Sequence, residues 1–308
     1  MKKEYLIGVD IGGTKIAIVL GTMDGDILKK VQFPTERSYK EVLNRISRHI
    51  NELAADLKGS VINAIGISCG GPLNSQNGVI LSPPNLPGWD EVPVCDILTQ
   101  ATGIPSFLEN DGNACALAEW LWGAGKGTRN MIFLTFGTGL GAGLILDGKL
   151  YEGTSGMAGE VGHIRLSEDG PEGYGKAGSW EGFCSGGGLS RFYHKRYGIV
   201  KSGEEICTLA NNGDEKALSV IDLSASYLGQ GISILLDILN PQKVIIGSIY
   251  TRNEALFRET MNNVINREAL IFSAKDCHIV PAALGENLGD MAALSVAMNG
   301  IRNQKDQK

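Results

Sequence analysis

A strand, a glycine turn, a second strand and an Asp-Gly turn occur twice in this order along the chain. The first copy covers residues 5–33 and has Gly12-Gly13 between its first two strands. The second copy covers residues 131–148 and has Gly137-Thr138-Gly139 at the equivalent place. Glycine turns between β-branched, apolar runs are typical of β-hairpins. The repetition therefore predicts two related half-domains, each opened by a hairpin.

The rest of the chain alternates apolar strands with helical patterns, which predicts an α/β fold. Ligands in such folds bind at strand ends, so we expect both glycine turns to face a cleft between two lobes. A small lobe is predicted over 1–118, with a C-terminal helix at 290–308 packing back on it, and a large lobe over 119–289. Helices are expected at 38–57, 94–102, 112–122, 188–197, 203–211, 215–239, 252–268 and 288–299, and further strands at 61–68, 104–108, 243–246 and 278–280.

Composition excludes several classes of function. The 308 residues carry 28 basic and 34 acidic side chains, a net charge of −6, which gives no basic field for nucleic acid or for a membrane surface. No apolar run approaches the roughly 18 residues of a membrane span, and no signal region precedes the first strand. The six cysteines are scattered without a CxxC pair, as expected of reduced thiols in a cytoplasmic protein.

The first glycine turn has the residues of a phosphate-binding loop. In Asp10-Ile11-Gly12-Gly13-Thr14-Lys15 the glycines allow backbone N–H groups to meet phosphate oxygens, and Thr14 adds a hydroxyl donor. Lys15 or Asp10 is suited to phosphate charge and Mg²⁺. Gly137-Thr138-Gly139 offers the same donors. Either turn alone is as well explained as a simple hairpin, but a matched pair favours phosphate binding. The chain has neither GxxxxGK[ST] nor a GxGxxG after its first strand, which disfavours a P-loop or dinucleotide site.

Two polar clusters are candidates for an acceptor site. Glu109-Asn110-Asp111 follows an apolar strand, where a carboxylate is able to accept a proton from a hydroxyl group; taken alone, the triplet is more often a helix N-cap. In Gly159-Glu160-Val161-Gly162-His163, the carboxylate and the imidazole are suited to binding a polyol, although a single histidine is more often structural.

The motifs DIGGTK, ENDGNA, FGTGLGAGL, AGEVGH and VIIGS resemble, in order and spacing, those of the ROK family of sugar kinases and sugar-responsive repressors. The resemblance covers nearly the whole chain. It implies an actin/hexokinase-like ATPase fold, with two ribonuclease-H-like lobes around a cleft. It also implies ATP-dependent phosphorylation of a sugar with Mg²⁺, and a homodimer or higher homo-oligomer.

The same resemblance implies a role for each matching residue. Asp111 is the catalytic base, and Asp10 organises Mg²⁺ through water. The sugar contacts are Gly71, Asn85, Asn110, Asp111, Glu160, His163 and Glu181. The nucleotide contacts are Asp10, Gly12, Gly13, Thr14, Lys15, Gly137, Thr138, Gly139 and Gly247, with Ser248 standing where the family more often has a second glycine.

One stretch departs from the family pattern. Many members follow the GExGH histidine with CxCGxxGCxE, whose cysteines bind a structural zinc together with that histidine. The cysteine positions are here Glu172, Tyr174 and Ser179, which cannot form a thiolate site. We therefore predict no zinc, a His163 that serves the sugar alone, and a loop at 167–179 held by packing through Tyr174 and Trp180.

A hexose kinase is the first expectation, with glucose and its 6-hydroxyl as the default acceptor. A fructokinase or an N-acetylhexosamine kinase of the same family remains open. A repressor would carry a DNA-reading domain before the phosphate loop, and the loop begins here at Asp10, which argues against that branch. A third hypothesis, a non-catalytic sugar-responsive regulator, is disfavoured by the presence of Asp10, both glycine turns and Asp111.

Overall fold

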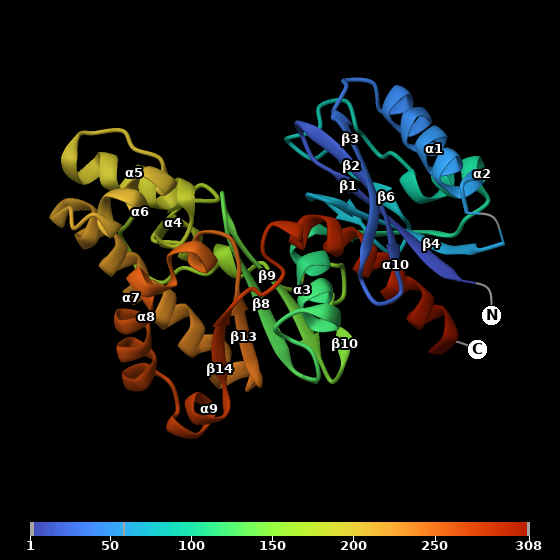
Figure 1. The fold of residues 1–308 in the computed structure, drawn as a ribbon. Helices are drawn as coiled ribbons and strands as arrows, with labels where there is room; N and C mark the ends of the chain where they lie inside the picture. Colours follow the sequence, from blue (N-terminus) through green and yellow to red (C-terminus); the bar gives the residue numbers. More distant parts are fainter. Residues whose placement is uncertain (1–2, 58, 307–308) are drawn as a thin grey trace. The chain divides into compact units, whose positions relative to one another are not determined.

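The computed structural model describes residues 3–57 and 59–306 (Figure 1). The chain divides into two compact units. Unit 1 contains residues 1–123 and 284–308, and unit 2 contains residues 124–283. Unit 1 thus includes the C-terminal helix. The boundaries of independently folding domains stay a prediction.

Unit 1 has a five-stranded sheet in the order β3-β2-β1-β4-β7. Its first three strands form two antiparallel hairpins, β4 then pairs parallel to β1, and β7 pairs parallel to β4. The strands are β1 (Glu4–Ile11), β2 (Lys15–Thr22), β3 (Ile27–Pro34), β4 (Val61–Cys69) and β7 (Ser106–Asn110), with a small separate pair β5 (Leu73–Asn74) and β6 (Val79–Ile80).

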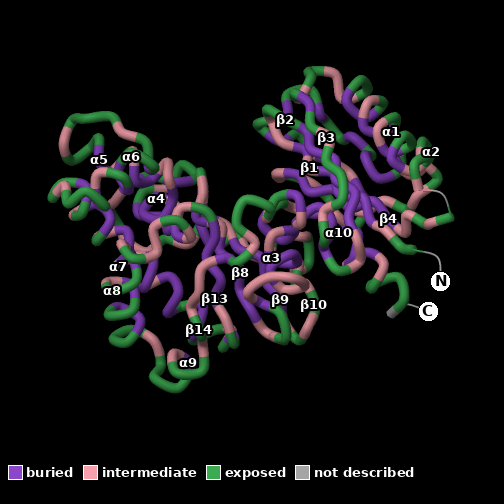
Figure 2. Tube along the Cα trace, in the orientation of Figure 1, coloured by how far each residue is buried: buried purple, intermediate pink, exposed green. Residues whose placement is uncertain are grey.

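Helices cover both faces of this sheet, as each face is apolar. The side chains of α1 (Tyr39–Ala55) and α2 (Val94–Thr102) share one buried cluster with one face of the sheet. On the other face, α10 (Leu288–Asp306) packs against β1 and β4, and α3 (Asp111–Trp122) packs on α10 (Figure 1). Burial of both faces explains why β1, β2 and β4 are nearly continuously apolar instead of alternating, whereas the edge strand β3 is largely exposed and polar (Figure 2).

Unit 2 repeats the strand order of unit 1, because its sheet runs β10-β9-β8-β13-β14. Again three strands form antiparallel hairpins, a fourth strand pairs parallel to the first of them, and a fifth pairs parallel to the fourth. The strands are β8 (Met131–Phe136), β9 (Leu140–Leu146), β10 (Lys149–Leu150), β13 (Lys243–Ile246) and β14 (His278–Pro281), and a separate hairpin joins β11 (Glu172–Gly173) to β12 (Lys176–Ala177). This repeated order is that of a ribonuclease-H-like core, and it confirms the predicted fold class.

The helices of unit 2 share one buried cluster with its sheet. They are α4 (Trp180–Phe183), α5 (Gly186–Tyr197), α6 (Gly203–Asn211), α7 (Glu215–Leu239), α8 (Ile249–Glu268) and α9 (Ile271–Asp276); short 3₁₀ turns lie at Val161–His163 in this unit and at Gly285–Asn287 in unit 1. Among the described residues, α7 alone has the length and composition of a membrane span. More than half of its most apolar window is buried, and α7 packs along α8, so we interpret it as a core helix.

Candidate active site

Three strands of unit 1 end side by side at one edge of the sheet. Ile11 at the end of β1 pairs with Cys69 of β4, and Cys69 pairs with Asn110 of β7. The residues that follow these ends are the glycine turn after Ile11, Gly70-Gly71 after Cys69, and Asp111 after Asn110. The parallel register therefore brings the predicted phosphate loop and the predicted base to the same edge of unit 1.

The glycine turn is held by its neighbours. A Cβ atom at Gly13 would lie 2.6 Å from the carbonyl oxygen of Asn85, so only glycine allows this approach. The Thr35 hydroxyl donates to the Gly12 carbonyl at 2.6 Å, and the Thr35 amide donates to the Thr14 carbonyl at 3.0 Å. A phosphate is repelled by carbonyl oxygens, so fixing these two on Thr35 favours anion binding by the loop. Thr35 was missed in the sequence because its role depends on the β2–β3 pairing.

Asp10 lies among other carboxylates. Burial, together with the negative charges of Asp290 and Asp111, raises the pKa of its carboxyl group to about 6, against the lowering effect of Lys15 and Lys30. Lys30 also forms an ion pair with the buried carboxylate of Asp290. Since no family motif marked Asp290, the sequence did not predict that it lies near Asp10.

The carboxylates of Asp10, Asp290 and Asp111 suit a hydrated divalent cation. After burial, the negative charges of Asp290 and Asp111 are the causes that raise the pKa of Asp10, so the three carboxylates repel one another. Mg²⁺ usually keeps several waters and takes one or two protein carboxylates together with phosphate oxygens. Within residues 3–57 and 59–306, no group of three His, Cys, Asp or Glu side chains is arranged to ligate a metal directly. Three carboxylates are the donor type that suits a Mg²⁺ ion with several of its waters retained.

Asp111 is the first residue of α3, and its side chain is exposed. The capping role belongs to Asn110, whose Oδ1 accepts from the Gly112 amide at 2.9 Å. The Oδ1 atom of Asp111 accepts from the same amide at 2.8 Å, which orients the carboxylate. Glu109 is buried and accepts from the Asn110 amide and the Asn113 side chain, so it is structural. The triplet therefore combines a cap with an exposed carboxylate.

The predicted sugar-binding residues of unit 1 surround Gly70-Gly71. A Cβ at Gly70 would lie 3.7 Å from Asn85 Nδ2 and 3.9 Å from Asp111 Oδ2. A Cβ at Gly71 would lie 3.5 Å from Asn110 Nδ2. Unit 1 thus gathers Gly71, Asn85, Asn110 and Asp111 beside the predicted phosphate loop, with the side-chain amides of both asparagines near the carboxylate.

In unit 2, the turn 137–139 joins β8 to β9 and contacts two other predicted site residues. Glu181 Oε2 accepts from the Leu140 amide at 3.1 Å, and a Cβ at Gly139 would lie 2.6 Å from the same oxygen. A Cβ at Gly137 would lie 3.4 Å from Ser248 Oγ. Ser248 has φ of 57°, a value that favours glycine, and Gly247 is buried against Phe133. Unit 2 therefore brings the turn, Glu181 and Gly247-Ser248 together.

The β11–β12 hairpin lies over the other predicted sugar residues of unit 2. Lys176 Nζ contacts His163 Nδ1 at 2.8 Å and donates to the His163 carbonyl, also at 2.8 Å. Tyr174 Oη donates to Glu160 Oε2 at 3.4 Å. Two predictions are corrected here: His163 is not left to the sugar alone, and Tyr174 is 52% exposed and does not hold its loop by packing. Trp180 is fully buried, as predicted.

The residues at the three aligned cysteine positions do not fit a zinc ion. Ser179 is buried, caps α4 and donates to the Gly173 carbonyl. Tyr174 lies in the hairpin turn, and the ammonium group of Lys176 already contacts His163.

The absence of zinc stays a prediction. We expect metal analysis of the purified protein to find well below one zinc per chain; one tightly bound zinc per chain would contradict it.

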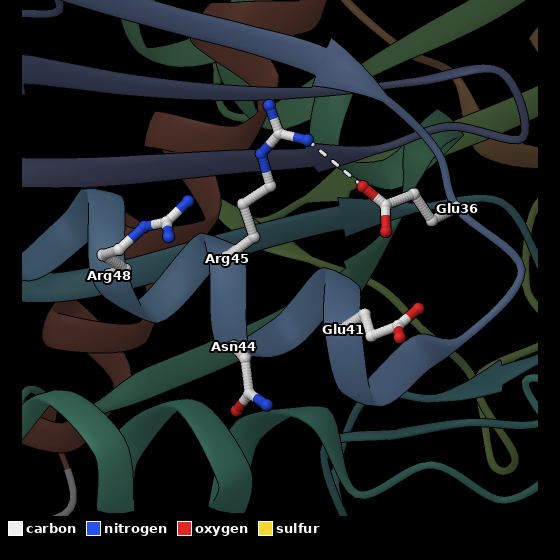
Figure 3. A pocket seen from close by; sticks show the side chains of 5 residues that line it. All are labelled: Glu36, Glu41, Asn44, Arg45 and Arg48. Carbon is white, nitrogen blue, oxygen red and sulfur yellow. Dashed lines mark hydrogen bonds and ion pairs between the residues drawn. The ribbon is translucent and has the colours of Figure 1, made fainter.

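A surface hollow on α1 lies outside these clusters. Glu36, Glu41, Asn44, Arg45 and Arg48 line it, and Arg45 pairs with Glu36 at 3.1 Å (Figure 3). Charges of both signs line this hollow, and none of the predicted site residues does. We therefore assign it no part in the candidate active site.

Comparison with known proteins places similar sequences in the same family that the motifs resemble. The family model described as "ROK family" matches residues 6–299. The glucokinase of Thermotoga maritima is 34% identical over 98% of this chain and 99% of its own length. A xylose repressor of Caldicellulosiruptor bescii is 31% identical over 86% of this chain and 71% of its own length.

Solved structures agree with this result. The ROK hexokinase of Thermus thermophilus superposes with a TM-score of 0.86 at 32% identity, covering 97% of this chain and 99% of the other. A ROK glucokinase of Streptomyces griseus, solved with glucose and AMPPNP, gives a TM-score of 0.75 at 30% identity, covering 95% and 99%. On the match of nearly the whole chain to the family model and to these relatives, the protein belongs to the ROK family.

Proposed function

We propose that this ROK sugar kinase transfers the γ-phosphoryl group of ATP to the 6-hydroxyl of a hexose, with glucose as the first candidate. The observation that carries the proposal is the common edge in unit 1 of the glycine turn after β1, Gly70-Gly71 after β4 and Asp111 after β7. The Thermotoga relative is a glucokinase, and the Streptomyces griseus glucokinase was solved with glucose and AMPPNP, which supports glucose and ATP as substrates here.

The nucleotide is proposed to bind through backbone groups. In unit 1, the N–H groups of Gly13 and Thr14 would meet phosphate oxygens, since the Gly12 N–H already donates to the Lys15 carbonyl at 3.1 Å. Thr35 keeps the neighbouring carbonyls engaged. Lys15, exposed at the start of β2, would add positive charge. In unit 2, the N–H groups of Thr138 and Gly139 would be the equivalent donors, since the Gly137 N–H already donates to the Gly139 carbonyl at 3.1 Å. Gly247 beside Ser248 would line the adenosine.

Asp10 and Asp290 would hold Mg²⁺ through water molecules. When bound, the ion would neutralise phosphate charge, which is the main electrostatic need of phosphoryl transfer. The carboxylate cluster around Asp10 supports this assignment, because its mutual repulsion is what a cation would relieve.

Asp111 is proposed to act on the acceptor. Phosphoryl transfer requires in-line positioning and a base that accepts the hydroxyl proton as the new P–O bond forms. The Asp111 carboxylate is exposed and is oriented by the Gly112 amide. Asn85, Asn110 and the backbone at Gly71 would bind neighbouring hydroxyls from unit 1, and Glu160, His163 and Glu181 from unit 2.

We also propose a homodimer in the cytoplasm. Exposed apolar side chains from α7 and from the start of α9 form a patch: Ile234, Ile238, Leu270, Ile271 and Phe272. A hydrogen bond from the Leu270 amide to Asp237 of α7 links the two segments. Ile238, Ile271 and Phe272 are 70%, 72% and 73% exposed, which favours burial of this patch against another copy of the chain.

Sedimentation velocity should give a dimer for the wild type and a monomer for Phe272→Glu, because a buried charge would destabilise the contact. A monomeric wild type would contradict the proposal.

Other acceptors are distinguished by one experiment. We expect Mg²⁺-dependent, saturable ADP release with at least one sugar from a panel of glucose, fructose, mannose, N-acetylglucosamine and N-acetylmannosamine. The best acceptor in the panel separates a glucokinase from a fructokinase or an N-acetylhexosamine kinase. Because some relatives are repressors, a non-catalytic sugar-responsive regulator is the alternative function. A regulator would bind a sugar in calorimetry but would release no ADP with any sugar of the panel.

A further inference from the structure

The β11–β12 hairpin contacts both polar residues of the Glu160–His163 segment. Its two strands pair through Glu172 with Ala177 and Gly173 with Lys176. The turn residues Tyr174 and Gly175 have φ of 53° and 65°, the signs of a tight two-residue hairpin turn. This turn brings a phenol and an ammonium group, two positions apart in sequence, to the same neighbouring segment.

The Lys176 contact fixes a chemical property of His163. An ammonium group has three donors and no acceptor, so in this 2.8 Å contact the Nδ1 atom of His163 accepts. A neutral imidazole with Nδ1 as acceptor carries its proton on Nε2. The second bond from Lys176, to the His163 carbonyl, anchors the ammonium group to the backbone of the same residue. Lys176 therefore selects one tautomer as well as one place for the ring.

The Tyr174 contacts act on the same pair. Its hydroxyl donates to Glu160 at 3.4 Å, and its ring centroid lies 5.6 Å from that of His163. One oxygen of Glu160 is thus placed by the hairpin, and the carboxylate can only accept hydrogen bonds when ionised. Glu160 and His163 become a complementary pair, with an acceptor on one residue and an N–H donor on the other.

We propose that the hairpin at 172–177 is a positioning element for the acceptor substrate, in which Lys176 holds His163 as the Nε2–H tautomer and Tyr174 orients Glu160. His163 then donates to a hydroxyl oxygen while Glu160 accepts from a second hydroxyl of the sugar. The recognised chemistry is a pair of neighbouring hydroxyl groups. Lys176 and Tyr174 are positioning residues, since each acts through another side chain. The substrate part of the proposal rests on the proposed sugar kinase activity.

The first test is the tautomer of His163 and needs no activity. In protein labelled with ¹⁵N-histidine, we expect Nδ1 of His163 to give the shift of an unprotonated nitrogen and Nε2 that of a protonated one; the spectrum of His163→Gln assigns the signals among the four histidines. Lys176→Met should mix the two tautomers, and Lys176→Arg should restore the wild-type pattern. A wild-type His163 with its proton on Nδ1, or a pattern unchanged in Lys176→Met, would overturn the proposal.

The second test separates binding from chemistry. Lys176→Met should raise the KM for the sugar by about tenfold, the equivalent of one well-placed hydrogen bond, with kcat within about threefold and the KM for ATP unchanged. Tyr174→Phe should shift the sugar KM in the same direction, and Lys176→Arg should recover most of the loss. The control is Lys195→Met, an exposed lysine on α5. An equal sugar KM in wild type and Lys176→Met would contradict the positioning role. If the wild type phosphorylates no sugar, the proposed function fails. The ¹⁵N measurement of the His163 tautomer still tests the role of Lys176 in that case.

Discussion

Replacing Asp111 with asparagine is expected to lower kcat by roughly 10²–10⁴-fold, the usual contribution of a general base. Asparagine keeps the size of the side chain and its oxygen toward the Gly112 amide, so helix α3 and the Asn110 cap are retained. It cannot accept the hydroxyl proton during transfer. Sugar binding, measured by calorimetry, should stay within a few-fold of the wild type, so the loss falls on the chemical step.

The matched control is Asp96→Asn. Asp96 is an exposed aspartate in the first turn of α2 in the same unit, and it lies outside the candidate site. The control should leave kcat and both KM values unchanged. Near-normal turnover in Asp111→Asn would show that this carboxylate is not the base, and a parallel loss in Asp96→Asn would point to a general charge or folding effect.

Replacing Asp10 with asparagine is expected to stabilise the protein while it reduces activity. The pKa of Asp10 is raised from 3.8 to about 6 by burial and by Asp290 and Asp111. A carboxyl group with a raised folded-state pKa opposes folding when it is ionised, so its cost is present above about pH 6 and disappears as the pH falls toward 4. A shift of this size corresponds to at most about 3 kcal/mol. Loss of the Mg²⁺-organising carboxylate should lower kcat roughly 10²–10³-fold.

Urea denaturation without ligands measures this cost. The free energy of unfolding of Asp10→Asn should exceed that of the wild type at pH 7.5, and the two should converge as the pH falls below about 4. A destabilised variant at pH 7.5 would mean that Asp10 is held by favourable contacts, and a gain independent of pH would remove its ionisation as the cause.

Much of the fold could be predicted because long apolar segments carry a clear period. The strand Met131–Phe136 and the helix Glu215–Leu239 were predicted to the residue, and Gly103 ends α2 in the left-handed conformation as expected. The short elements could not be predicted. The two-residue strands β11 and β12 depend on the turn at Tyr174-Gly175, and α8 begins three residues early because a non-helical Asn253 interrupts its pattern.

In the candidate site, too, some residues could be predicted from the sequence and others could not. Residues at strand ends could be assigned from the sequence, because parallel strands end at a common edge and the motifs marked which ends matter. Contacts that depend on how loops and turns fold could not be assigned from the sequence. Lys176 reaches His163 only through the hairpin turn, Thr35 reaches the phosphate loop through the β2–β3 register, and Asp290 approaches Asp10 from α10. None of these three residues belongs to a motif, and the charge or hydroxyl that each supplies is common on protein surfaces.

Single-turnover transfer of the labelled γ-phosphoryl group of ATP to the best acceptor sugar tests the central claim most directly. At saturating substrates and rapid quench, the wild type should form the sugar phosphate with a rate constant roughly 10²–10⁴-fold above that of Asp111→Asn, while both proteins bind the sugar equally. Equal rate constants for the chemical step in the two proteins would contradict the account.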